Sequence, residues 1–343
     1  MPTKINKSYI IIGIILIALL IAAIILTIWR NNVNKVALIN NPNNEKVFFP
    51  KLLQDNQSIY YYSNTSNSIK KWDLKKNSIE TIVKLSFKDT NNIIYSPDLS
   101  MALIKTENPS NAADHHTFLI NLDTKQEVKK LSDNILNVSW SPDSKKIAYH
   151  YLDWNLDDAD WIATSNPDGN SESIITDIEY ENAQIGWADN KNLVYYNIPS
   201  ETFKAIIYLL STETKKQIEI ADQYYLGDIT NILTNKFLID GTTSESANPG
   251  LSLLDTKSKK ITGLLPASSV DKAVYSAKNN SVYTASRPYG NSDLFQIINL
   301  DTNKPSKLKI RSSDDISATN LMVTSDSKTL YFTSGNNLYK KVL

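Results

Sequence analysis

The chain has 343 residues, with 36 basic and 36 acidic side chains and no cysteine. Because a nucleic-acid partner requires a basic surface to neutralise its phosphates, the zero net charge argues against one. The absence of cysteine excludes disulfides, thiolate nucleophiles and cysteine metal ligands. The nine glycines are too scattered to form a Walker loop or a GxGxxG turn, which excludes these phosphate-binding motifs.

The first expected element is a helix, because residues 10–28 form an uncharged apolar run of 19 residues between Tyr9 and Trp29. Such a helix is about 28 Å long, close to the roughly 30 Å of the hydrocarbon core of a bilayer. Aromatic residues at both ends are typical of membrane interfaces. The alternative is a cleaved signal peptide, but its apolar core is only about 7 to 15 residues long and ends in small residues. We therefore expect one transmembrane helix over residues 9–29.

The charges beside this helix indicate its orientation. Basic groups lie on both sides of it: the amino terminus, Lys4 and Lys7 before it, and Arg30 and Lys35 after it. By the positive-inside rule, this balance favours residues 1–8 as a short cytoplasmic tail. Residues 30–44 are then a linker, and residues 45–343 form one domain outside the cytoplasm. We therefore expect a single-pass membrane protein of a bacterial envelope.

After the linker, two turn motifs recur with a period near 46 residues. Ser-Pro-Asp at 96–98 returns at 141–143, and related sequences at the expected intervals bring the number of units to seven. These related sequences contain Asp55, Asp189, Asn235, Asn279 and Asp326. Tetrads similar to Asp-Thr-Lys form the second motif, and the segments between the turns alternate between apolar and polar residues, as strands do. Each unit therefore contains four short strands.

Seven units of about 45 residues with four strands each predict an all-β, seven-bladed β-propeller of antiparallel blades. No helical pattern follows Trp29. The last unit, which ends at Leu343, has only three strands. We expect residues 36–39, VALI, to supply the fourth strand by pairing the two ends of the chain. The alternative is that this segment is plain linker.

Three stretches, NIIYSPDLSMALI, VSWSPDSKKIAYH and MVTSDSKTLYFTS, resemble the Ser-Pro-Asp-Gly repeat of TolB-like and WD-repeat-like β-propellers. The resemblance covers about residues 45–343 and departs from the repeat where Leu99 and Ser144 replace glycine. It implies the fold and leaves the function open, because such blades serve both scaffolds and enzymes. The same repeat occurs in the propellers of prolyl oligopeptidases and dipeptidyl peptidases. Those enzymes also carry a hydrolase domain with a GxSxG nucleophile motif, which this sequence lacks.

In such a propeller both kinds of short turn lie on one face of the disc, which we call the turn face. The connections between the second and third strands lie on the opposite face, which we call the long-loop face. These connections are long and differ in composition, and they comprise residues 107–116, 152–160, 198–203, 241–249 and 286–293. Because variable loops on a rigid scaffold carry many binding residues, we expect a partner to bind on the long-loop face.

The third unit has the most unusual of these loops, YLDWNLDDADW. We predict that it contributes to binding through Asp153, Trp154, Asp157, Asp158, Asp160 and Trp161. Asp153, Asn155 and Asp157 match the Asp-x-Asn-x-Asp opening of an EF-hand calcium loop. The match then fails, because Asp158 replaces the required glycine and Thr164 the required glutamate. A docking loop anchored by its tryptophans, or a solvated acidic loop, is therefore favoured over a calcium site, and we expect no other cofactor.

Two smaller groups complete the candidate binding residues. His115 and His116 are adjacent in the second unit, and neighbours on a strand point to opposite sides, so the pair is a poor metal site. Arg287 and Tyr289 lie in the sequence SRPYGNSD of the sixth unit, where the proline and glycine indicate a turn. We predict that these four residues contact a partner and that none of them is catalytic.

These patterns favour a binding module over an enzyme. We expect a non-catalytic, membrane-anchored propeller that binds another envelope protein or envelope component through its long-loop face. The alternative is a propeller enzyme acting on envelope glycans or peptides, which would gather acids, histidines and arginines at the mouth of the channel. A third hypothesis, in which the ring serves only as structural packing, predicts neither that cluster nor a docking patch.

Overall fold

The structure of the protein is a computed structural model. It describes residues 17–24, 36–108, 110–153, 159–179, 183–197, 204–223, 225–242, 250–266, 268–287, 293–308 and 315–343. From residue 36 onwards the described residues form strands joined by turns, together with one short 3₁₀ helix, η1 (Val270–Lys272). The prediction of an all-β domain is confirmed.

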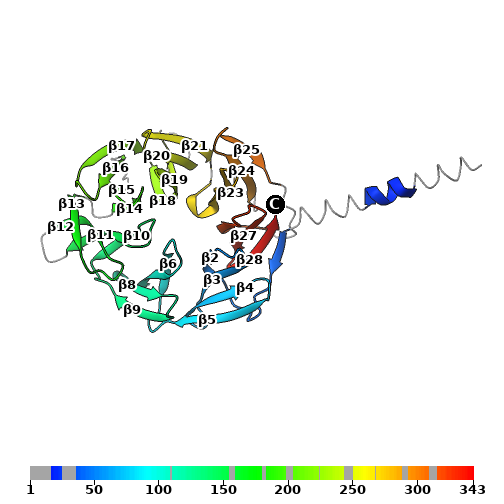
Figure 1. Ribbon diagram of the computed structural model, residues 1–343, viewed down its shortest axis with the longest axis horizontal. Coiled ribbons are helices and arrows are strands. Elements are labelled where there is room, and N and C mark those ends of the chain that lie inside the picture. Colours follow the sequence, from blue (N-terminus) through cyan, green and yellow to red (C-terminus); the bar gives the residue numbers. More distant parts are fainter. Residues whose placement is uncertain are drawn as a thin grey trace, which may run out of the picture.

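Within the described residues, the strands form seven four-stranded antiparallel sheets, the blades, arranged in a ring (Figure 1). Blades 1 to 6 each take four successive strands, from the centre of the ring outwards. In this order the strands are β2 (Phe48–Leu52), β3 (Ser58–Ser63), β4 (Ser68–Asp73) and β5 (Ser78–Lys84) in blade 1; β6 (Thr90–Tyr95), β7 (Met101–Asn108), β8 (Asn111–Asn121) and β9 (Gln126–Lys130) in blade 2; β10 (Ile135–Trp140), β11 (Ile147–Asp153), β12 (Ala159–Ser165) and β13 (Ser173–Ile178) in blade 3; β14 (Ala183–Trp187), β15 (Asn192–Asn197), β16 (Ala205–Ser211) and β17 (Gln217–Gln223) in blade 4; β18 (Tyr225–Leu233), β19 (Lys236–Thr242), β20 (Gly250–Asp255) and β21 (Lys260–Pro266) in blade 5; and β22 (Ala273–Ser276), β23 (Ser281–Ser286), β24 (Leu294–Asn299) and β25 (Lys304–Lys307) in blade 6.

Blade 7 closes the ring with strands from both ends of the chain. It contains β26 (Thr319–Val323), β27 (Thr329–Ser334) and β28 (Asn337–Val342), and β1 (Val36–Ile39) is its outermost strand. β1 pairs antiparallel with β28, so that Val36 lies opposite Lys341 and Ile39 opposite Leu338. The predicted closure by residues 36–39 is therefore confirmed. Because β28 ends at the turn face, β1 begins there.

The Ser-Pro-Asp motif forms the turn between the first two strands of a blade. Its serine and aspartate side chains hydrogen-bond to each other and to the backbone of the turn. Ser141 Oγ donates a hydrogen bond to Asp143 Oδ1 (2.7 Å) and accepts one from the backbone N–H five residues later (2.9 Å). The copy at 96–98 makes the same two bonds. Leu99 and Ser144 adopt φ angles of 64° and 61°, in the left-handed region that favours glycine. This conformation explains why the repeat usually has glycine at these two positions.

Hydrogen bonds between blades also follow the sequence period. Near the end of four inner strands, a side chain donates a hydrogen bond to a backbone carbonyl of the preceding blade. The pairs are Tyr95 with Phe49, Trp140 with Ile94, Trp187 with Ser139 and Asn231 with Trp187, at distances of 3.3, 2.9, 3.1 and 2.9 Å. These contacts link blades 1 to 5 around the channel.

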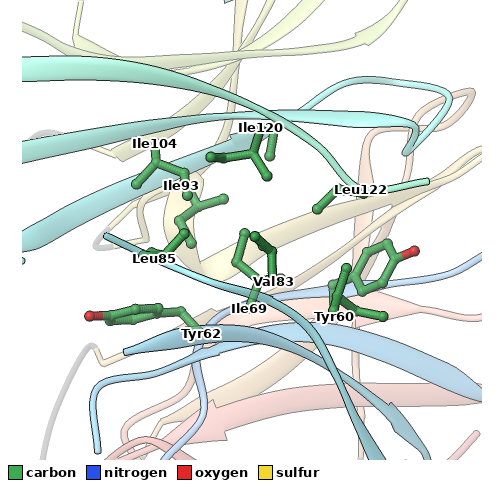
Figure 2. Close-up of a cluster of buried hydrophobic side chains, with 11 residues drawn as sticks. Tyr60, Tyr62, Ile69, Val83, Leu85, Ile93, Ile104, Ile120 and Leu122 are labelled. Carbon is green, nitrogen blue, oxygen red and sulfur yellow. The ribbon is translucent and has the colours of Figure 1, made fainter. Parts of the chain in front are cut away.

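The hydrophobic core lies between neighbouring blades. In Figure 2, residues of blade 1 such as Tyr62 and Ile69 pack against Ile93, Ile104 and Ile120 of blade 2. Equivalent clusters occupy the other interfaces between consecutive blades, including the one between blades 7 and 1. Because both faces of each blade are covered, the middle strands are almost continuously apolar, as in the fully buried strand β3.

The predicted transmembrane helix falls largely outside the described residues. Residues 17–24, a part of the expected span 9–29, are α-helical. None of the helices formed by the described residues has both the length and the apolar character required to cross a bilayer. The membrane anchor and the orientation of the chain therefore stay predictions.

Candidate functional site

The structure describes about half of the residues predicted to bind a partner. Those outside the described residues are Trp154, Asn155, Asp157, Asp158 and Tyr289, so the calcium hypothesis stays untested. Asp153 ends β11. The remaining candidates come from three blades and are His115 and His116 on β8, Asp160 and Trp161 on β12, and Arg287 after β23. All of them lie toward the long-loop face, where the second and third strands of each blade are connected.

In blade 2 the two middle strands extend beyond the inner and outer strands on the long-loop face. Strand β7 has 8 residues and β8 has 11, whereas β6 and β9 have 6 and 5. The β7–β8 hairpin therefore continues beyond its neighbours, with Glu107 in register with His115. A projecting hairpin with charged and imidazole side chains is a suitable contact element for a partner.

The two histidines of this hairpin are not brought together. His116 Nδ1 lies 2.7 Å from Asp133 Oδ1, and Lys130 Nζ lies 2.9 Å from the other oxygen of the same carboxylate. Desolvation acts to raise the pKa of Asp133, but hydrogen bonds from Lys130 and His116 outweigh it and lower this pKa. His115 Nε2 is buried without a hydrogen bond to any described residue. In the described part of the chain, no three histidine or carboxylate side chains are grouped as metal ligands.

In blade 3 the structure pairs Asp160 with a histidine, His150. The His150 side chain is fully buried and that of Asp160 is 5% exposed, and His150 Nε2 lies 3.4 Å from Asp160 Oδ2. The other ring nitrogen, Nδ1, accepts a hydrogen bond from the backbone N–H of Ala183 (3.3 Å), the first residue of β14 in blade 4. Trp161 stacks on Tyr151, with 4.7 Å between ring centroids. His150 thus joins blades 3 and 4.

Burial determines the charge state of His150. Desolvation lowers its pKa, and the nearby Asp160 carboxylate opposes this shift without cancelling it. The neutral imidazole is therefore favoured in the folded chain, with Nδ1 free to accept the bond from Ala183. Protonation of Nδ1 would break this connection between blades 3 and 4.

We expect acid to weaken the propeller through His150. The unfolded chain binds a proton at this residue below about pH 6.5, whereas the folded chain resists protonation, so the free energy of unfolding falls as pH decreases, by at most ~1.4 kcal/mol per pH unit. Asp240 acts oppositely, because burial raises its pKa to about 6 and its protonation favours the folded state.

The variant His150→Asn isolates the histidine, because the amide oxygen can still accept the bond from Ala183. Urea unfolding measured between pH 7.5 and 5 should show a smaller loss of stability for this variant than for the native chain. Identical pH profiles for the two proteins would contradict the assignment.

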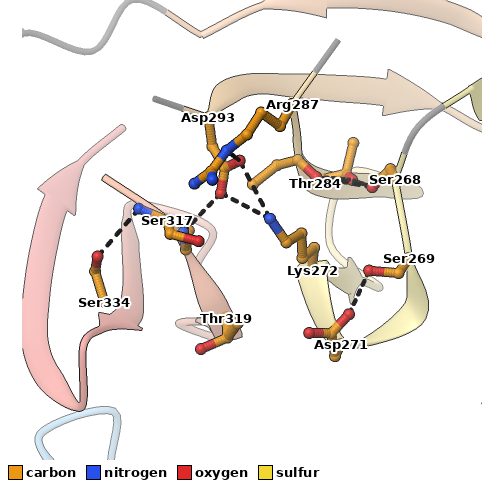
Figure 3. Close-up of polar contacts among 12 residues, drawn as sticks. Ser268, Ser269, Asp271, Lys272, Thr284, Arg287, Asp293, Ser317, Thr319 and Ser334 are labelled. Carbon is orange, nitrogen blue, oxygen red and sulfur yellow. Dashed lines mark hydrogen bonds and ion pairs between the residues drawn. The ribbon is translucent and has the colours of Figure 1, made fainter. Parts of the chain in front are cut away.

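In blade 6, Arg287 belongs to an ion-pair network centred on Asp293 (Figure 3). The Asp293 side chain is 0% exposed, and its oxygens lie 3.3 Å from Arg287 Nε and 3.1 Å from Lys272 Nζ. The same carboxylate accepts a hydrogen bond from the backbone N–H of Ala318 (2.6 Å). The network joins η1, blade 6 and the connection to blade 7. Arg287, whose side chain is 38% exposed, can also contact a partner.

The centre of the ring contains charged residues that the sequence analysis missed. A cavity of about 760 Å³ is lined by the inner strands β2, β6, β10, β14 and β18 together with β7 and η1, and its charged residues are Lys51, Lys105, Asp228 and Asp271. A second cavity of about 470 Å³ lies on the side of β22 and β26. Lys51 and Asp271 line both cavities. A charged residue within an otherwise apolar inner-strand sequence, such as Lys51 in FFPKLL, is the signal that could have identified them.

Several solved structures are similar to this chain. Oligogalacturonate lyase in complex with manganese has a TM-score of 0.65 and 11% identity, over 90% of each chain. A prolyl endopeptidase has a TM-score of 0.63 and 14% identity over 89% of this chain, which spans 49% of the peptidase. TolB from Acinetobacter baumannii is also similar, with a TM-score of 0.48 and 16% identity over 83% of this chain and 76% of TolB. No protein-family profile matches the sequence. No curated protein matches it either.

The expected propeller is confirmed. The resemblance predicted from the Ser-Pro-Asp repeats holds at the level of the fold, with seven four-stranded blades in the described residues. Identities of 11 and 14% establish a shared fold alone. Of the two similar proteins, one is a lyase and the other a peptidase, so the fold does not indicate one function. Function must therefore be argued from the faces of the disc and from the channel.

Proposed function

We propose that this chain is a membrane-anchored, non-catalytic binding module that docks another envelope protein on its long-loop face. The observation that carries the proposal is the place where the chain enters the disc. Val36 pairs with Lys341 near the end of β28, so the amino-terminal segment joins blade 7 at the turn face. A tether attached at the turn face leaves the long-loop face free.

The short length of the tether also supports this proposal. Seven Cα–Cα steps separate Trp29, the end of the predicted helix, from Val36. Fully extended, this segment spans about 25 Å, so an anchored propeller would stay close to the bilayer. Holding the disc near the membrane raises its effective concentration for partners in the same membrane.

The two faces also differ in what they offer a partner. The turn face is built from tight turns whose polar side chains accept hydrogen bonds from the backbone of the same turn, as at Ser141 and Asp143. The long-loop face has the projecting β7–β8 hairpin and the partly exposed Arg287. Arginine and aromatic side chains on a rigid scaffold are typical anchors of protein interfaces.

An enzyme acting on envelope glycans or peptides is the second candidate. The observation that favours it is the pair of carboxylates, Asp228 and Asp271, in the central cavity. Paired carboxylates are the acid and base or nucleophile of glycan hydrolysis when they lie about 5 to 10 Å apart across the substrate.

Site-specific photo-crosslinking in cells tests the docking proposal. A photoreactive residue at Glu107 or Arg287 on the long-loop face should yield the same protein adduct. The same probe at the exposed turn-face positions Lys75 or Asp123 should yield none. Adducts confined to the turn face would overturn the docking proposal. Turnover of a glycan or peptide by the purified chain, lost in Asp228→Asn, would favour the enzyme.

A further inference from the structure

The charges of the central cavity lie on opposite walls. Lys51 on β2 and Lys105 on β7 belong to blades 1 and 2, whereas Asp228 lies on β18 of blade 5 and Asp271 on η1. Across the ring, β18 faces β2 and β6 (Figure 1). The cavity therefore has a cationic wall and an acidic wall.

Lys51 is the principal charge of the cationic wall. In the part of the chain that the structure describes, no acidic side chain forms an ion pair with it. Water within the channel reaches the side chain, but protein surrounds it, and this desolvation lowers the pKa of Lys51. Lys105 differs, because its Nζ donates a hydrogen bond to the carbonyl of Leu136 (2.6 Å). An anion at Lys51 would therefore supply a counter-charge that the described residues do not provide.

The backbone before Lys51 is strained. A β-bulge interrupts the pairing of β2 with β3 between Phe48 and Lys51. Within it, Phe49 adopts a φ of 48°, a conformation that costs a bulky residue of the order of 1–3 kcal/mol. Bulges re-aim the side chains that follow them and are common next to binding sites. Strain at this point is consistent with a functional role for the position of Lys51.

The acidic wall also has no counter-charge from the residues that the structure describes. Asp240 on β19 accepts a hydrogen bond from the backbone N–H of Val270 (2.7 Å), which fixes η1 against blade 5. Burial raises the pKa of Asp240 to about 6, and the charges of Asp228 and Asp271 add to the shift. Among the described residues, no lysine or arginine forms an ion pair with these three carboxylates. A cation at this wall would relieve their mutual repulsion.

We propose that the central channel binds a zwitterionic ligand, with its carboxylate at Lys51 and its ammonium group at the wall formed by Asp228 and Asp271. Free amino acids and short peptides share this chemistry. The cavity of about 760 Å³ is within the range of small-molecule sites. Each charged end of the ligand loses water when it enters the channel, and a charge-assisted hydrogen bond to the protein replaces that hydration. The proposal concerns the channel and is independent of docking on the long-loop face.

Calorimetric titration of the full chain in detergent micelles tests this proposal. The probes are glycine, triglycine and pentaglycine, together with N-acetyl-triglycine and triglycinamide, each of which lacks one terminal charge. At least one free-ended probe should bind, and blocking either end should weaken binding roughly tenfold or more. Preference for glycine identifies an amino-acid site, and preference for the longer probes identifies a peptide site.

Four variants assign the two ends. Lys51→Met should bind triglycine no better than triglycinamide, and Lys51→Arg should retain the difference. Asp271→Asn should bind triglycine no better than N-acetyl-triglycine. Lys84→Met, an exposed substitution on the outer strand β5, should bind like the native chain. Melting curves establish that each variant is folded. The proposal is overturned if no free-ended probe binds, if blocked probes bind equally well to the native chain, or if folded Lys51→Met behaves like Lys84→Met.

Discussion

A chain that begins at residue 40 is expected to have a free energy of unfolding roughly 4 kcal/mol lower than that of a chain that begins at residue 36. The two chains differ only by strand β1. Val36 is 7% exposed and packs into the core between blades 6 and 7, and its burial contributes about 2 kcal/mol. The ladder with β28 adds hydrogen bonds worth about 1 kcal/mol each.

Loss of β1 has a second consequence, because β28 becomes an unpaired edge strand. Such an edge can pair with another chain, so the shortened protein should also self-associate. Urea unfolding monitored by tryptophan fluorescence measures the first effect, and sedimentation velocity measures the second. Val36→Asp is the matched point variant, because it keeps the strand but places a charge in the core. Equal unfolding midpoints for the chains beginning at residues 36 and 40 would contradict the proposed role of β1 in stability.

Replacing Asp293 with alanine is expected to destabilise the fold by roughly 3 kcal/mol, because breaking a buried ion pair leaves its partner uncompensated. The Asp293 side chain has no exposed surface and that of Lys272 is only 19% exposed, so water cannot fully replace the lost carboxylate. The backbone N–H of Ala318 would lose its acceptor as well. The loss should loosen the contacts that hold η1 and the start of blade 7 against blade 6.

Two further variants separate the contributions at this site. Asp293→Asn keeps an oxygen for the Ala318 N–H but removes the charge, so it should fall between alanine and the native residue. Asp123→Ala, on an exposed turn, is the control and should change stability by less than about 0.5 kcal/mol. Thermal unfolding provides the comparison. An Asp293→Ala protein as stable as the Asp123→Ala protein would show that the network in Figure 3 contributes nothing to stability.

The repeat could be read from the sequence because its signals are local. Ser-Pro-Asp forms its turn through bonds within six residues, and the left-handed residue that follows is required by that turn alone. The weak units also have the expected turns, since Asn235 and the residue after Asn279, Asn280, adopt the left-handed conformation in the first turns of blades 5 and 6. Blade number, strand order and closure by residues 36–39 followed from counting these turns.

The candidate site was less accessible to sequence reasoning. The strands that border the predicted loops end on the expected face, because strand order determines which connections share a face. Composition did not indicate, however, that Asp160 would be buried against His150, or that Arg287 would pair with Asp293. These contacts depend on packing between residues in different strands. The roles predicted for residues of the acidic loop stay predictions.

The sequence by itself thus determined the architecture of this protein, because short-range turn chemistry repeated seven times leaves a ring of blades as the compact solution. Only the tertiary structure decided the channel. Lys51 and Asp271 are 220 residues apart in the chain and line the same cavity because the ring closes on itself. No local sequence pattern specifies that these two residues line the same cavity. Closure fixes which inner-strand side chains meet at the centre, and with it the chemistry that the channel offers.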